Sequence, residues 1–134
     1  MNLPSKIKIL FVGEAVTLAH VARPMAIAQN MPTKFFDIHM AMDSRYQFLL
    51  KPDPNINIHF HQIKSPSSSS FRQQVEAGKF PYHKNEIISL VEDDLSLLEE
   101  IKPDVVIGDF RISLSISAKY KKVPYFSITN AHWL

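Results

Sequence analysis

The chain has 134 residues, of which 46% are hydrophobic and 21% are charged, and its net charge is +2. This size and balance predict one soluble domain with a hydrophobic core. The charge excess is too small and too scattered to form the basic face that binds nucleic acid. The absence of cysteine excludes disulfides, thiolate zinc sites and a cysteine nucleophile. It fits a reducing compartment, so we expect a cytoplasmic location.

Apolar runs bounded by turn residues predict five strands, separated by segments with helical periodicity. The predicted strands cover residues 7–12, 35–40, 56–63, 104–109 and 123–129. The predicted helices cover residues 18–30, 46–50, 71–77, 83–102 and 113–121. This alternation predicts a doubly wound, Rossmann-like α/β fold with a parallel sheet in the order 3-2-1-4-5 and helices on both faces. No apolar run approaches the roughly 20 residues needed to span a bilayer.

Three local features refine this picture. Pro24 lacks the amide donor of a helix interior, so we expect the first helix to settle only from Arg23, with His20 on a looser segment. The serine-rich stretch 64–70 reads as a mobile loop on the ligand side of the sheet. The third predicted strand alternates apolar and polar residues, which favours an edge position.

His20 and Asp109 are the candidate catalytic residues. His20 follows the first predicted strand, and Asp109 ends the fourth. In the order 3-2-1-4-5 these strands are neighbours at the switch point, where open α/β sheets bind ligands. A carboxylate beside an imidazole fixes its tautomer, and such a pair can take a proton from a substrate hydroxyl. A structural histidine and a helix-capping aspartate are the alternatives.

Other motifs in the sequence give weaker evidence of a function. The pair His59-x-His61 could hold a metal from one strand face, but no carboxylate or third histidine lies nearby in sequence, so we predict no metal site. The chain has three glycines, and they are spaced neither as a dinucleotide fingerprint nor as a phosphate loop. The serine-hydrolase elbow G-x-S-x-G is also absent from the sequence.

Two segments resemble family-one glycosyltransferases, the two-domain GT-B enzymes that include macrolide-type and UDP-sugar transferases. They read KIKILFVGEAVTLAHVARPMAIA and KPDVVIGDFRISLSISAKYKKVPYFSITNAHW, and they lie in the family's order near the two ends of the chain. The region between them, about residues 42–84, matches in pattern only. Lys122 stands where the family often has glycine before the Val-Pro pair.

The resemblance implies a mechanism. His20 takes the place of the general base that deprotonates the acceptor, and Asp109 that of the aspartate that steadies it. The acceptor oxygen attacks the anomeric carbon of a nucleotide sugar with inversion, and neither a metal nor a cofactor is required. Five further residues are expected to line the acceptor pocket: Glu14, Thr17, Phe110, Asn130 and His132.

The resemblance also implies that residues 1–134 are a single, truncated N-terminal domain, because the family's donor-binding domain has no counterpart here. We expect an acceptor-binding half that is inactive alone and that needs a donor domain in cis or in trans. An unpaired edge at the fifth strand would favour self-association. Two other interpretations remain: a non-catalytic binding module that keeps the fold, and a flavodoxin-like domain of unrelated function. The flavodoxin-like interpretation predicts that His20 and Asp109 are not neighbours.

Overall fold

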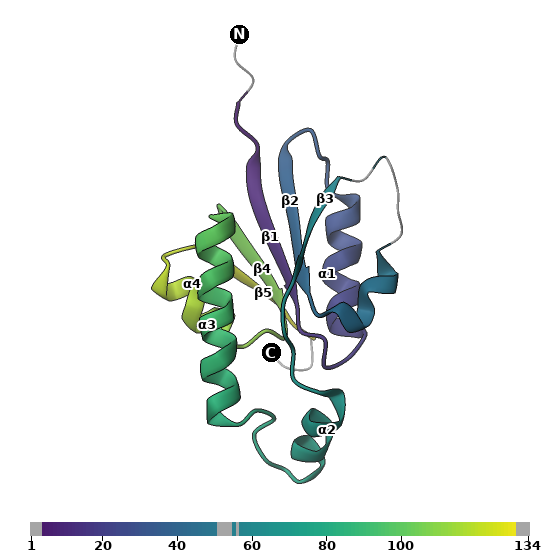
Figure 1. Cartoon of the computed structure of the whole chain (residues 1–134). Helices are drawn as coiled ribbons and strands as arrows, with labels where there is room; N and C mark the ends of the chain where they lie inside the picture. Colours follow the sequence, from purple (N-terminus) through teal and green to yellow (C-terminus); the bar gives the residue numbers. More distant parts are fainter. Residues whose placement is uncertain (1–3, 51–54, 56, 131–134) are drawn as a thin grey trace.

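A five-stranded parallel sheet forms the centre of the molecule (Figure 1). The computed structural model describes residues 4–50, 55 and 57–130. The strands are β1 (Ile7–Gly13), β2 (Phe36–Met42), β3 (Ile58–Gln62), β4 (Val105–Asp109) and β5 (Tyr125–Ile128). Their order is β3-β2-β1-β4-β5, and every pairing is parallel. The predicted fold class, strand order and edge position of β3 are therefore confirmed.

The helices cover both faces of the sheet. They are α1 (Ala19–Asn30), the 3-10 helix η1 (Ser44–Leu49), α2 (Ser68–Glu76), α3 (Lys84–Ile101) and α4 (Leu114–Tyr120). Helix α1 lies on one face, α3 and α4 lie on the other, and α2 lies beyond the carboxyl ends of the strands (Figure 1). None of the described helices is long and apolar enough to cross a membrane.

The central strand β1 contributes side chains to two hydrophobic cores. Ile9 and Phe11 pack into the core beneath α1, whereas Leu10 and Val12 pack into the core beneath α3. All four side chains are buried, which explains why β1 is almost wholly apolar. Each such burial stabilises the fold by about 1.5–3 kcal/mol, so β1 anchors both layers.

Helix α1 is regular from Ala19, ahead of Pro24, because its first turn does not need the amide that Pro24 lacks. The amides of Val21 and Ala22 both donate to the carbonyl of Leu18, at 3.1 and 2.9 Å. This closes the first turn ahead of Pro24, which lies inside the helix. The expectation of a loose segment around His20 was wrong: His20 is held in the first turn of α1.

The serine-rich stretch is also more regular than predicted. The side chain of Ser67 accepts a hydrogen bond from the amide of Ser70 at 3.1 Å and so caps α2. Residues 68–70 therefore belong to a helix, and only residues 63–67 form the connection after β3.

Candidate active site

A cavity of about 400 Å³ opens at the carboxyl ends of β4 and β5. Its lining combines polar and apolar side chains from α1, from the β4–α4 region, and from β5 and the residues after it: His20, Arg23, Asp109, Phe110, Arg111, Ile112, Ser115, Tyr125, Ser127, Ile128, Thr129 and Asn130. This is the position at which open α/β sheets bind their ligands.

His20 and Asp109 meet at the mouth of this cavity. The parallel pairing of β1 with β4 places Gly13 beside Asp109, and His20 follows in the first turn of α1. Nδ1 of His20 lies 2.9 Å from Oδ1 of Asp109. The Asp109 side chain is fully buried, and that of His20 is 14% exposed. This proximity contradicts the flavodoxin-like interpretation, which requires the two residues to lie apart.

Gly13 permits the close approach of α1 to the end of β1. A Cβ atom at this position would lie 2.8 Å from the carbonyl oxygen of His20 and 3.0 Å from Cα of Val21. Any side chain here would push the first turn of α1 away from the sheet. The geometry of the His20–Asp109 pair therefore depends on a glycine at the end of β1.

Arg23 is a third member of the site that the sequence analysis missed. It donates from Nε to Oδ2 of Asp109 at 2.8 Å and from Nη2 to Oδ1 at 2.7 Å. Nη1 also donates to the side-chain oxygen of Asn130. Because residues three apart share a face of a helix, the spacing of His20 and Arg23 was the available signal. Arg23 holds Asp109 in a bidentate ion pair and fixes the orientation of its carboxylate.

The hydrogen bonds of Asp109 bear on the protonation of His20. Nδ1 of His20 lies 2.9 Å from Asp109 Oδ1 and 3.0 Å from Nη2 of Arg23. A neutral imidazole can donate from Nδ1 to the carboxylate or accept there from the guanidinium, but it cannot do both. Donation to Asp109 leaves a bare lone pair on Nε2, which makes no hydrogen bond within the described residues. A histidine with this tautomer can accept a proton.

Phe110 covers the other side of His20. Its ring stacks on the imidazole with centroids 4.6 Å apart and planes 14° from parallel. The Phe71 ring of α2 contacts the Phe110 ring edge-on. The backbone of Phe110 has φ of 60°, a left-handed conformation that is strained for a bulky residue. Such strain is retained at sites where the surrounding structure fixes a side chain.

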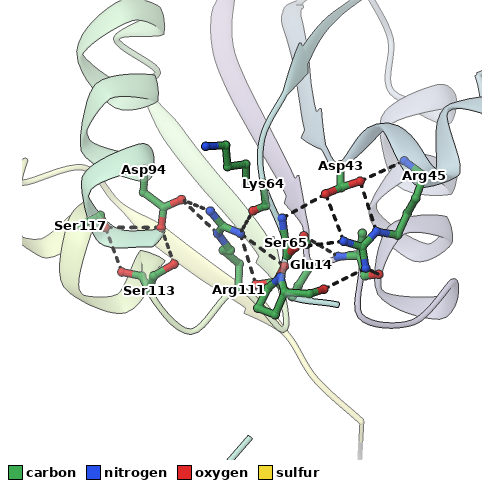
Figure 2. A network of polar contacts seen from close by, with 11 residues as sticks. Glu14, Asp43, Arg45, Lys64, Ser65, Asp94, Arg111, Ser113 and Ser117 are labelled. Carbon is green, nitrogen blue, oxygen red and sulfur yellow. Dashed lines mark hydrogen bonds and ion pairs between the residues drawn. The ribbon is translucent and has the colours of Figure 1, made fainter. Parts of the chain in front are cut away.

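A second ionic cluster lies next to the first, but it is closed. Arg111 contacts Glu14 from Nη1 at 3.3 Å and Asp94 from Nε at 3.0 Å (Figure 2). All three side chains are fully buried. Asp94 also accepts from the hydroxyl of Ser113, and Arg111 donates to the carbonyl of Lys64 at 2.7 Å.

Burial dominates the electrostatics of this closed cluster. It raises the pKa of Glu14 and of Asp94, and the Arg111 guanidinium opposes part of each rise. Two carboxyl groups face one guanidinium, so full ionisation would leave one buried negative charge without a counterion. The cluster therefore favours a proton on one carboxyl group. Its contacts also join the ends of β1 and β4 to α3.

Arg45 extends the polar contacts to the loop after β3. It is fixed by Asp43 and donates to the carbonyls of Ser65 and Pro66 at 2.9 and 2.8 Å, and to that of Ala15 at 3.1 Å (Figure 2). The segment between β1 and α1 is thus held against the loop that leads into α2.

The remaining predicted pocket residues divide into three groups. Phe110 and Asn130 line the cavity. Glu14 does not, because it is buried against Arg111, and the exposed Thr17 is not part of the lining either. His132 lies outside the described residues.

Comparison with known proteins identifies the relatives of the chain. No family model matches it. It is 46% identical over 126 residues to a "PGL/p-HBAD biosynthesis rhamnosyltransferase" of Mycobacterium bovis (strain BCG). The match covers 94% of this chain and 27% of that relative. The chain is homologous to part of a glycosyltransferase. A "PGL/p-HBAD biosynthesis glycosyltransferase" of Mycobacterium tuberculosis is 40% identical over 126 residues, which are 94% of this chain and 29% of that relative.

Solved structures support the same fold. UGT73P12 of Glycyrrhiza uralensis, complexed with glycyrrhetinic acid 3-O-monoglucuronide, superposes with a TM-score of 0.65 at 16% identity, covering 95% of this chain and 29% of that one. UGT2 of Phytolacca americana, complexed with UDP-2fluoro-glucose and pterostilbene, gives 0.63 at 14% identity, with 95% and 31% coverage. The chain thus spans about a third or less of its glycosyltransferase relatives and structural neighbours.

Proposed function

We propose that the chain is the acceptor-binding half of an inverting glycosyltransferase that moves a sugar from a nucleotide-sugar donor to an acceptor hydroxyl. The observation that carries this proposal is the His20–Asp109 contact of 2.9 Å at the mouth of a cavity. Asp109 takes the Nδ1 proton and holds the ring, so that Nε2 can act as a general base. The 46% identity to a rhamnosyltransferase supports the same chemistry.

The transfer step follows from this assignment. The acceptor hydroxyl gives its proton to Nε2 of His20 as its oxygen attacks the anomeric carbon from the face opposite the leaving group. The bond from that carbon to the nucleotide breaks, and the electron pair leaves with the phosphate oxygen. Asp109 stabilises the imidazolium that forms, while Arg23 keeps the carboxylate aligned.

The cavity lining favours a particular kind of acceptor. Phe110, Ile112 and Ile128 present apolar surface beside His20. An acceptor whose hydroxyl is attached to an apolar or aromatic body would bury that body here and place its oxygen near Nε2. Asn130, held by Arg23, offers a polar contact at the same rim.

Binding of the nucleotide-sugar donor is not assigned to residues 1–134. The chain corresponds to 27% of its rhamnosyltransferase relative, and we assign nucleotide-sugar binding to a region outside these residues, in cis or in trans. Since stabilisation of the transition state needs donor contacts, we expect no turnover by residues 1–134 alone.

A non-catalytic module is the second candidate. One relative, 40% identical over 126 residues, is named "Inactive PGL/p-HBAD biosynthesis glycosyltransferase" in Mycobacterium bovis (strain BCG). Overall similarity of this degree therefore also extends to a protein that is named inactive. In this interpretation the cavity binds an acceptor-like molecule without transfer.

A chimera tests both candidates. This chain replaces the aligned 126 residues of the Mycobacterium bovis rhamnosyltransferase, and rhamnosyl transfer is measured together with the fold of the product. We expect transfer by the chimera and a loss of about 10²–10⁴-fold in its His20→Ala variant. His83→Asn, which keeps a capping side chain at the start of α3, serves as the histidine control and should leave transfer unchanged. Equal transfer with and without His20 contradicts the proposed base, and a folded but inactive chimera favours the non-catalytic module.

The exposed edge strand β5 is a candidate surface for self-association. It lies at the edge of the described sheet and carries Phe126, which is 61% exposed. We include in the proposal that this edge pairs with a second copy of the chain. Light scattering at high concentration should show a dimer, and a monomer there rules out this contact.

A further inference from the structure

Four polar side chains gather on one face of strands β2 and β3, away from the cavity. The register pairs His39 with His59 and Ala41 with His61, so these histidines share a face, which Asp37 also occupies two residues before His39. Ile38 and Met40 point to the opposite face, into the core beneath α1. The sequence alone separates the four residues into two distant pairs, and the strand register brings them together.

The distances within this group match those between the ligands of one metal ion. Oδ1 of Asp37 lies 3.2 Å from Nε2 of His59, and Oδ2 lies 3.3 Å from Nε2 of His39. Tetrahedral ligands about 2.0–2.1 Å from a zinc ion are separated by about 3.3–3.4 Å. One ligand atom from each of Asp37, His39 and His59 can be chosen so that all three lie within 4.8 Å of one another. Small side-chain rotations would bring them around a common centre.

Nε2 of His39 has an unusual environment for a buried nitrogen. The His39 side chain is 12% exposed, and its Nε2 makes no hydrogen bond despite the nearby Asp37 carboxylate. A buried polar atom without a hydrogen bond is rare and calls for an explanation. A lone pair directed at a cation beside the carboxylate provides one.

His61 supplies the outer support that a ligating histidine needs. Its Nε2 lies 2.8 Å from Nδ1 of His39. When Nδ1 of His39 donates in this contact, the proton is kept off Nε2, which is then free to ligate. The ring of His39 is also stacked against those of His59 and His61, with centroids 4.6 and 5.1 Å apart, which limits its rotation.

We propose that Asp37, His39 and His59 form a binding site for a divalent transition metal such as zinc, with His61 as the outer partner of His39. Two imidazole nitrogens and a carboxylate oxygen suit zinc better than magnesium or calcium, which prefer oxygen ligands. Water can reach the site, because the His59 side chain is 51% exposed.

The position of the site indicates a structural role. Asp37 and His59 are each the second residue of their strand, so the site lies toward the amino ends of β2 and β3. The His20 cavity lies at the opposite, carboxyl edge. A metal here would fasten the edge strand β3 to β2 and would not take part in transfer.

Zinc binding to the untagged, metal-free chain tests the site, measured by calorimetry and by the absorption spectrum of bound cobalt. We expect one ion per chain, a cobalt spectrum of nitrogen and oxygen ligands, and a higher Tm with zinc. His61→Asn should weaken binding about 10–100-fold, and Asp37→Asn and His59→Gln should weaken it more. Both ligand positions are partly exposed, at 32% and 51%, so these variants should fold.

His20→Gln is the matched control, because Nδ1 of His20 also lies close to an aspartate, 2.9 Å from Oδ1 of Asp109. It should leave zinc affinity and the cobalt spectrum unchanged. The proposal is overturned if the chain binds no zinc at millimolar concentration. It is also overturned if His20→Gln weakens binding while Asp37→Asn and His59→Gln do not.

Discussion

Two arginine–carboxylate clusters lie side by side at the carboxyl edge of the sheet, and they differ in what they leave open. Arg111 is fully buried with Glu14 and Asp94, and the cluster joins β1, β4 and α3. Arg23 is 33% exposed and shares Asp109 with a histidine that borders a cavity. These two clusters thus place the same pairing of charges in a sealed setting and in an accessible one.

The difference separates a structural role from a chemical one. In the sealed cluster the charged side chains of Arg111, Glu14 and Asp94 are fully buried and face one another. In the accessible cluster one nitrogen, Nε2 of His20, is left without a hydrogen bond within the described chain. Ionic pairing therefore does not identify the site by itself; the uncommitted nitrogen beside a cavity does.

The largest expected effect is loss of the sealed cluster through Arg111→Met. It leaves two buried carboxyl groups without a counterion, and we expect a loss of about 3–5 kcal/mol in the free energy of unfolding. Urea denaturation measures it. Arg72→Met, at an exposed position of α2, is the control and should change stability by less than about 0.5 kcal/mol. A similar, small change in both variants would show that Arg111 does not hold the sheet edge.

Arg23→Met should cost less, because the accessible cluster keeps one partner and is reached by water. Asp109 retains its contact with His20, so we expect a loss of about 1–3 kcal/mol in the same denaturation experiment. If this loss equals or exceeds that of Arg111→Met, the distinction between a sealed and an accessible cluster fails.

The smallest expected effect is that of Glu14→Gln. Burial raises the folded-state pKa of Glu14 above its ordinary 4.5, so this group stabilises the fold below pH 4.5 and loses that contribution as pH rises through the folded-state pKa. The variant lacks this decline. Its unfolding free energy should be within about 1 kcal/mol of wild type at pH 5 and should move in favour of the variant by pH 7.5. A movement in favour of wild type would mean that Glu14 is stabilised as an anion.

The sequence predicts the sheet order and the His20–Asp109 pair for one reason. Strand periodicity and right-handed crossovers restrict the topology, and the topology places the ends of β1 and β4 together. Arg23 could also have been predicted, because it lies three residues from His20 and so shares a face of the same helix. The closed cluster was not, because no pattern along the chain distinguishes a buried arginine such as Arg111 from a solvated one.

The histidine group shows another limit of the sequence. The lack of a carboxylate or third histidine near His59-x-His61 in sequence argued against a metal site. Asp37 and His39 supply both from the neighbouring strand, but only the register of β2 against β3 reveals it. A shift of one residue in that register would have placed the two strands' polar side chains on opposite faces.

The tautomer of His20 in this chain is the most direct test of the proposed base. Long-range proton–nitrogen correlation spectra of the neutral ring report which ring nitrogen of His20 carries the proton. We predict that Nδ1 is protonated and Nε2 is bare, and that Asp109→Asn disturbs this preference. A proton on Nε2, with Nδ1 accepting from Arg23, would contradict the role of His20 as base, because Nε2 could not then take the proton of an acceptor.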